Sequence, residues 1–148
     1  MEIVKHPNKI LGQKLKKIKQ VTPEIKRLIE AMRQTVIEAN GVGLTANQVG
    51  EDWAVFVIDK KLAEENGVPD VYINPEVTES SRELAELEEG CLSLPDYWRP
   101  VTRPKKIKLK ALDENGKKIK FKAKGFLARV LQHEVDHING LLIKDRIK

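Results

Sequence analysis

The sequence is poor in cysteine, in aromatic residues and in long hydrophobic runs. Cys91 is its only cysteine, so an intramolecular disulfide is excluded, and a lone thiol suits a reducing compartment better than secretion. The first residues, Met1 to Pro7, contain no apolar signal segment, and no stretch approaches the roughly 18 apolar residues of a membrane span. These absences predict a cytoplasmic protein that does not enter a membrane.

Length and charge set further limits. A chain of 148 residues with 41% hydrophobic content has the size of one compact domain, so we expect a single domain over residues 1–148. The 27 Lys and Arg residues outnumber the 22 Asp and Glu residues, which gives a formal net charge of +5. An excess this mild more often reflects surface solvation than polyanion binding. Charge alone therefore selects no function.

Two segments carry helix signals. Thr22-Pro23-Glu24 is typical of a helix start, and apolar residues then recur at helical spacing until Asn40-Gly41. A second helix is predicted from Phe126 to Ile138, with Gly140 as its C-terminal cap.

Other segments carry strand signals. Short apolar runs predict strands at 53–58, before a loop around Asn66-Gly67, and at 71–75, where Pro75 should stop the second strand. Strict alternation from 105 to 124 around a turn at 113–116 predicts an antiparallel hairpin. One hairpin face would carry seven lysines: Lys106, Lys108, Lys110, Lys118, Lys120, Lys122 and Lys124.

This lysine face has two interpretations. The simpler is a solvated surface that resists aggregation, although like charges directly opposite each other would cost stability. The other is a docking surface for ribosomal RNA, whose binding would weaken with salt. We favour the first.

The predicted second helix contains the HExxH segment His133-Glu134-Val135-Asp136-His137. At helical spacing, its two histidines and Glu134 share an arc with the apolar residues Phe126, Leu127 and Val130, whereas Gln132, Asp136 and Asn139 face the other side. Buried ionisable groups need a compensating partner. Histidines at i and i+4 can bind one metal ion, and the glutamate between them can take a proton from its water. The alternative is a surface helix with ordinary i,i+4 pairs, which the apolar surroundings disfavour.

A catalytic metal needs a third protein ligand and an open position for water. Cys91 is the candidate, in the segment Glu89-Gly90-Cys91-Leu92-Ser93, which we expect to be irregular because Pro95 follows. A single cysteine is more often a small buried hydrophobe. Here the two-histidine helix, with His6 as the one other histidine, favours the ligand interpretation.

Three segments together resemble the peptide deformylase family. They are Gly41-Val42-Gly43-Leu44-Thr45-Ala46-Asn47-Gln48, Glu89-Gly90-Cys91-Leu92-Ser93 and Gln132-His133-Glu134-Val135-Asp136-His137, in the family's order. His6-Pro7 and Asn74-Pro75 extend the resemblance to nearly the whole chain. It implies an α+β fold, with antiparallel β-sheets packed around a central HExxH-bearing helix and an additional N-terminal helix.

The resemblance also implies roles for individual residues. Cys91, His133 and His137 would bind the metal, and Glu134 would act as general acid and base. Gln48 and the backbone amide of Leu92 would stabilise the oxyanion. Substrate-site residues would be Val42, Gly43, Leu44, Leu87 and Glu89, with Leu87 in the methionine pocket and Glu89 also supporting a metal ligand.

The implied reaction is hydrolytic removal of the formyl group from the N-terminal methionine of nascent polypeptides. One divalent ion per chain would be required, and the resemblance implies Fe²⁺, although a His₂Cys site also suits Zn²⁺, Ni²⁺ or Co²⁺. Implied partners are N-formyl-Met nascent peptides and, weakly through the basic surface, the ribosome. We expect a monomer.

Two positions depart from the family pattern. Thr45 stands where the motif usually has alanine, which bears on substrate preference. The chain stops at Lys148, whereas many members carry a further C-terminal helix, so we expect no ribosome contact through such a helix.

Two other functions compete with deformylation. An HExxH metalloprotease usually takes its third ligand from further along the chain, but Asp145 is the sole carboxylate after His137. A catalytically silent, metal-stapled module on the ribosome would close the fourth position with another ligand. The presence of Glu134 and Gln48 argues against that second alternative.

Overall fold

The computed structural model describes residues 1–146, so the predicted domain end at 148 lies outside the described residues. The helices are α1 (Pro23–Ala39), α2 (Lys60–Asn66) and α3 (Gly125–Ile138), with 3₁₀ turns η1 (Lys9–Gly12), η2 (Ala46–Val49) and η3 (Ile143–Asp145). The strands are β1 (Gly43–Thr45), β2 (Val55–Ile58), β3 (Val71–Ser80), β4 (Leu84–Cys91), β5 (Leu94–Pro104), β6 (Lys106–Leu112) and β7 (Lys118–Lys124). No helix among residues 1–146 is long and apolar enough to cross a membrane.

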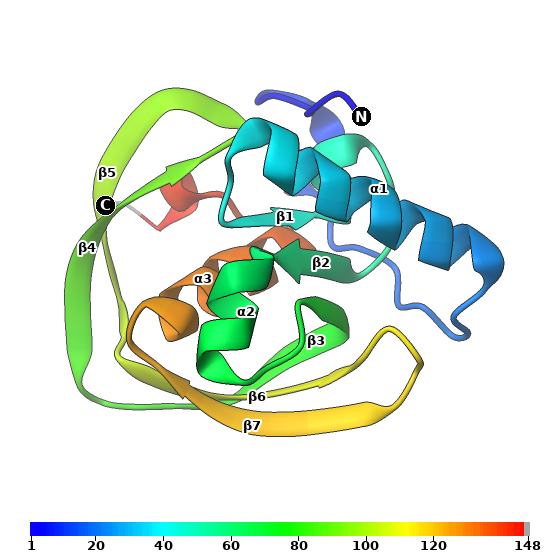
Figure 1. The fold of residues 1–148 in the computed structure, drawn as a ribbon. Coiled ribbons are helices and arrows are strands. Elements are labelled where there is room, and N and C mark those ends of the chain that lie inside the picture. The colour runs from blue at the N-terminus through cyan, green and yellow to red at the C-terminus, as the bar shows by residue number, and fades with distance from the viewer. Residues whose placement is uncertain (147–148) are drawn as a thin grey trace.

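The strands form two antiparallel sheets around one helix. The larger sheet has the order β1-β2-β3-β6-β7, and β4 pairs with β5 in a separate two-stranded sheet. Figure 1 shows α3 enclosed between these sheets, with the β4–β5 hairpin curving around one side and α1 lying across β1 and β2. The predicted α+β fold with a central HExxH helix is therefore confirmed.

Helix α1 begins and ends at the predicted residues. Thr22 Oγ1 accepts a hydrogen bond from the Ile25 amide at 3.3 Å, and Asn40 adopts φ 57°, a left-handed conformation typical of helix C-termini. The predicted apolar stripe supplies the four core residues Ile25, Ile29, Met32 and Val36.

Helix α3 is buried on more sides than its sequence predicts. We expected Gln132 and Asp136 on a polar outer face, but Gln132 is only 8% exposed and Asp136 only 6%. Phe126, expected in the core, is 52% exposed. Both predictions were wrong. The β4–β5 hairpin covers the side of α3 that carries Gln132 and Asp136, and it leaves the start of the helix exposed. The cap prediction holds, since Gly140 (φ 77°) donates to the His137 carbonyl at 3.0 Å.

The lysine hairpin forms as predicted from β6 and β7. Lysines face each other directly in the register, as Lys106 with Lys124, Lys108 with Lys122 and Lys110 with Lys120. Glu79 and Glu76 of the neighbouring β3 lie 3.7 Å from Lys108 and 3.4 Å from Lys110. These two glutamates offset part of the repulsion between the facing lysines.

The predicted end of the strand at Pro75 was wrong. Strand β3 runs on to Ser80, past Pro75, because the register shifts between Ile73 and Glu76 and the proline lies in that irregularity. Strand β2 starts at Val55, two residues later than expected. Strands β1 and β4 and helix α2 carried no signal that we identified.

The segment around Cys91 is irregular as expected, because the register of β4 against β5 shifts between Glu89 and Cys91 and a turn follows at 92–93. Cys91 ends β4 and pairs with Leu94 at the tip of the hairpin. Strand β5 contains Pro95, Pro100 and Pro104. A strand in a two-stranded sheet has one edge without ladder partners, so proline is tolerated there.

Candidate metal centre

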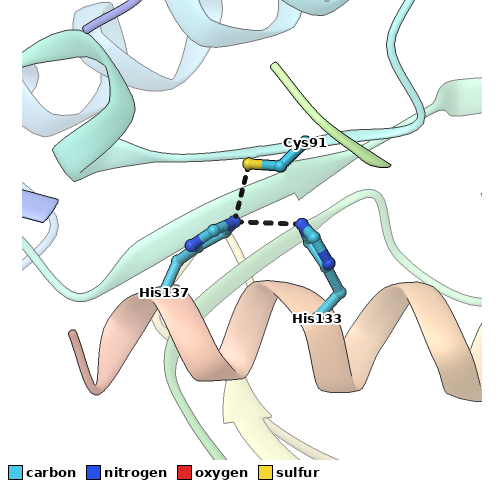
Figure 2. A group of neighbouring side chains, drawn as sticks. All are labelled: Cys91, His133 and His137. Atoms are coloured by element: carbon cyan, nitrogen blue, oxygen red, sulfur yellow. Dashed lines mark hydrogen bonds between the residues drawn. The ribbon is translucent and has the colours of Figure 1, made fainter. Parts of the chain in front are cut away.

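The three predicted metal ligands converge. Cys91 reaches the site from the end of β4, and His133 and His137 lie one turn apart on α3 (Figure 2). The Nε2 atom of His137 is 3.4 Å from Cys91 Sγ and 3.0 Å from His133 Nε2. All three donor atoms lie within 4.8 Å of one another.

This spacing fits a divalent ion. Ligand bonds of about 2.1 Å to nitrogen and 2.3 Å to sulfur place the donors of a tetrahedral site roughly 3.3 to 3.6 Å apart. The thiol and imidazoles are therefore already close to the separation that one shared ion requires. Three protein ligands leave a position open for water or substrate, which distinguishes this cluster from a closed structural site.

Glu89 fixes the orientation of His133. Its Oε1 atom accepts a hydrogen bond from His133 Nδ1 at 3.0 Å, which leaves Nε2 facing the cluster. Arg103 donates to both carboxylate oxygens of Glu89, at 2.6 and 2.9 Å, and Arg129 donates to Oε2. Burial would raise the pKa of Glu89, but the hydrogen bonds from His133 and Arg103 and the Arg103 charge hold it at about 2. Glu89 is therefore ionised at neutral pH.

The two histidines differ in protonation. Burial lowers the pKa of His133, but hydrogen bonds to Cys91 and Glu89 outweigh it and raise that pKa to about 10. Burial and the nearby His133 charge hold the pKa of His137 well below its usual value. Binding of an ion through Nε2 requires that nitrogen to be unprotonated, so metal binding competes with protonation of His133.

Glu134 lies beside the cluster and is only 2% exposed. Burial raises its pKa, and the opposing effects of His133 and of a hydrogen bond from Thr45 only partly offset this. The Thr45 hydroxyl donates to Glu134 Oε1 at 2.9 Å. A carboxylate with a raised pKa is suited to exchange protons near neutral pH.

Gln48 is held with its amide nitrogen toward the cluster. The Thr45 amide donates to Gln48 Oε1 at 3.0 Å, so Nε2 is left to donate to Ser93 Oγ at 3.1 Å and to Cys91 Sγ at 3.6 Å. Leu92, the other predicted oxyanion donor, lies in the turn between β4 and β5.

A cleft of about 650 Å³ opens beside these residues. Its apolar lining includes Leu87, Leu92, Trp98, Phe126 and Val130, and its polar lining includes Gln48, His133 and Glu134. Of the predicted substrate residues, Val42, Gly43, Leu87 and Glu89 also line it. Leu44 instead points its side chain into the core, where it is fully buried.

Sequence reasoning missed several residues of this site. Arg103, Arg129 and Asp136 are buried ions that form a network with Glu89, and Arg146 donates to Asp136 at 2.6 and 3.0 Å. Nothing in the local sequence separates these arginines from surface residues. The Trp98 ring lies so close to Gly90 that a Cβ there would come within 2.6 Å of it. The position of Trp98 shortly after the cysteine segment was the one sequence signal available.

Known proteins match both the sequence and the fold. The sequence model for "Polypeptide deformylase" matches residues 1–148. A peptide deformylase from Thermodesulfovibrio yellowstonii is 43% identical over 147 residues, which span 99% of this chain and 88% of the relative. One from Mesorhizobium japonicum is 43% identical over 141 residues, 95% of this chain and 80% of the relative.

Solved structures agree with the sequence comparison. The peptide deformylase of Thermotoga maritima superposes with a TM-score of 0.91 and 37% identity, covering 99% of this chain and 97% of that one. The Synechococcus elongatus enzyme in complex with actinonin gives a TM-score of 0.92 and 36% identity, covering 100% and 79%. The chain therefore belongs to the polypeptide deformylase family, whose members are metal-dependent hydrolases.

Proposed function

We propose that this chain hydrolyses the formyl amide at the N-terminal methionine of nascent polypeptides. The observation that carries the proposal is the convergence of Cys91, His133 and His137 beside the buried carboxylate of Glu134. An open apolar cleft adjoins this group, which suits a peptide substrate with an unbranched methionine side chain. Family membership supports the same activity.

Glu134 is the proposed general acid and base. A divalent ion held by Cys91, His133 and His137 would lower the pKa of a water molecule at its open position. Glu134 would take a proton from the attacking water while the oxygen of that water adds to the formyl carbon. The carboxyl group then returns the proton to the departing nitrogen, the C–N bond breaks, and formate and a free amine leave.

Gln48 and Leu92 are the proposed oxyanion donors. The Nε2 atom of Gln48 points toward Cys91, which supports a role as a donor to the formyl oxygen. The Leu92 amide belongs to the neighbouring turn. Two such donors stabilise the charge that develops on the oxygen during addition.

Strand β1 is the proposed docking edge for the peptide. It is the outer strand of its sheet and pairs with β2 on one side only. A peptide can therefore add as a further strand along Val42, Gly43 and Leu44 through backbone hydrogen bonds. Leu87, on the rim of the cleft and 49% exposed, would contact the methionine side chain.

We propose Fe²⁺ as the native ion. Two imidazoles and a thiolate also accept Zn²⁺, Ni²⁺ or Co²⁺, so ion supply in the cell decides occupancy. Metal analysis of protein purified without oxygen tests this, and zinc in such a preparation with full activity would contradict it.

We also propose a single catalytic domain that acts as a cytoplasmic monomer and contacts the ribosome weakly through the lysine face. The seven lysines of β6 and β7 support the last point, because phosphate contacts require clustered cations. Binding to isolated ribosomes should fall steeply as salt increases. Salt-insensitive binding would contradict a contact of this kind.

Formate release from a formyl-Met peptide tests the activity. The Glu134→Ala variant should lose about 10²- to 10⁴-fold in turnover while still binding one metal ion per chain. A peptide with an internal amide bond and no formyl group is the control, and its cleavage would favour a metalloprotease. Full activity of Glu134→Ala would overturn the assigned role.

A further inference from the structure

Thr45 connects the edge strand to the general base. It ends β1, is fully buried, and occupies the position at which the motif usually has alanine. Its Oγ1 atom lies 2.9 Å from Glu134 Oε1 and 3.3 Å from the Glu134 backbone carbonyl oxygen. Both acceptors belong to one residue 89 positions away, and the single hydroxyl hydrogen makes its shorter contact with the side-chain oxygen.

The two oxygens of Glu134 have different surroundings. Oε1 accepts the threonine hydroxyl. Oε2 lies against Gly43, so close that a Cβ added to this glycine would come within 2.7 Å of it. Gly43 and Glu134 both line the cleft, and within residues 1–146 the hydrogen bonds of the carboxylate involve only Oε1. The oxygen without a partner is therefore the one beside the proposed peptide edge.

Alanine at position 45 would remove the hydrogen bond that orients this carboxylate. The terminal torsion of glutamate has a broad minimum, so the plane of its carboxylate is set mainly by contacts. Within residues 1–146 the Thr45 hydroxyl is the one donor to Oε1, so removing it would leave a buried carboxylate oxygen unsatisfied, which is costly. The backbone amide of the same threonine holds Gln48 Oε1 at 3.0 Å, so Thr45 contacts both the proposed base and the proposed oxyanion donor.

We propose that Thr45 is a positioning residue whose hydroxyl fixes Glu134 Oε1 and thereby presents Oε2 to the reacting water. This inference rests on the proposed function for the role of Glu134. It assigns the extra hydroxyl of this chain to the proton-transfer step and not to recognition of the substrate side chain.

Kinetics of two Thr45 variants and one control variant test the proposal. Thr45→Val keeps the volume and removes the hydroxyl, and we expect kcat for a formyl-Met peptide to fall about tenfold, as for loss of one hydrogen bond to a charged group. KM should stay within about twofold, because peptide contacts are unchanged. Thr45→Ser restores the hydroxyl and should recover most of the lost kcat. An unchanged kcat in Thr45→Val, or no recovery in Thr45→Ser, would overturn the proposal.

Thr35→Val is the matched control. Thr35 is also buried, its hydroxyl donates at 2.8 Å to the Ala31 carbonyl within α1, and it is not one of the residues that line the cleft. The same loss of a buried hydroxyl there should leave kcat unchanged. A comparable drop in Thr35→Val would mean that reduced stability, and not positioning of Glu134, lowers the rate.

A double-mutant cycle on metal-free protein tests the hydrogen bond without activity. The urea midpoint is measured for wild type, Thr45→Val, Glu134→Ala and the double variant. If the bond exists, removing the hydroxyl should lower the midpoint much more when Glu134 is present than when it is absent. Equal shifts would refute the contact. A wild-type enzyme that released no formate would instead refute the proposed function, and the cycle would still report on the bond.

Discussion

Charged side chains gather in two regions of this molecule, and their surroundings differ sharply. The Glu89 network, which comprises Glu89, Arg103, Arg129, Asp136 and Arg146, lies mostly in the interior, and each charge has an opposite partner within hydrogen-bonding distance. The lysine face of β6 and β7 is largely exposed and places like charges opposite one another. The two regions hold similar numbers of charges, but the buried charges should affect the stability of the fold much more.

Solvent explains the difference. In water, a pair of like charges several ångströms apart interacts weakly and is screened by salt. In the interior, a charge whose partner is removed cannot be solvated, so it destabilises the fold strongly. The Glu89 network should therefore control stability and metal binding, whereas the lysine face should tolerate substitution.

The largest expected effect comes from breaking the buried network. Glu89→Ala leaves Arg129 without its carboxylate and Arg103 with Asp136 alone, and we expect about 3 to 5 kcal/mol less stability in urea denaturation of the metal-free protein. Metal affinity should also fall about 10- to 100-fold, because His133 loses its orienting acceptor. Glu86→Ala, an exposed change on the same strand, is the control and should alter neither quantity. Equal changes in stability and in metal affinity in the two variants would show that the buried and the exposed carboxylates contribute alike.

A smaller effect should appear in acid. The pKa of Glu89 is about 2 in the folded chain against an ordinary 4.5, so its ionised form stabilises the fold fully above pH 4.5. This contribution, about 3 kcal/mol, is lost as the pH falls from 4.5 toward 2. Metal-free wild type and Glu89→Gln should therefore differ most near neutral pH and converge in acid. Unfolding curves that stay parallel from pH 5 to 2 would contradict the assigned pKa.

The smallest effect is expected at the lysine face. Lys122→Glu places a carboxylate opposite Lys108, which should raise stability by about 0.5 kcal/mol at low salt and by less at high salt. Lys19→Glu, an exposed change outside the hairpin, makes the same change in net charge. A gain of the same size in both variants would show that net charge, and not the cross-strand pair, is responsible.

Elements with local signals were predictable. The hydroxyl of Thr22 and the left-handed conformation of Asn40 act within one helix turn, so the bounds of α1 could be read directly. The same holds for Gly140 after α3 and for the alternating β6–β7 hairpin. The identities of the proposed metal ligands came from residue types, because two histidines at i and i+4 and one cysteine have few alternatives.

Elements whose form depends on distant partners were missed. Strand β5 contains three prolines and is a strand because β4 pairs with it along its length. Phe126 is exposed and Asp136 is buried, the reverse of what we expected. The reason is that the β4–β5 hairpin covers one side of α3 and leaves the start of the helix exposed. The spacing of apolar residues within α3 does not show which side of the helix another segment will cover.

By itself, the sequence determined which donor atoms this protein has and where its main helices begin and end, since helix caps and ligand types act locally. The tertiary structure alone decided that Glu89 stands behind His133 and that the hydroxyl of Thr45 reaches Glu134. These contacts join segments 44 and 89 residues apart. Only the packing of β1 and β4 against α3 brings such segments within hydrogen-bonding distance, and no property of either segment alone specifies that approach.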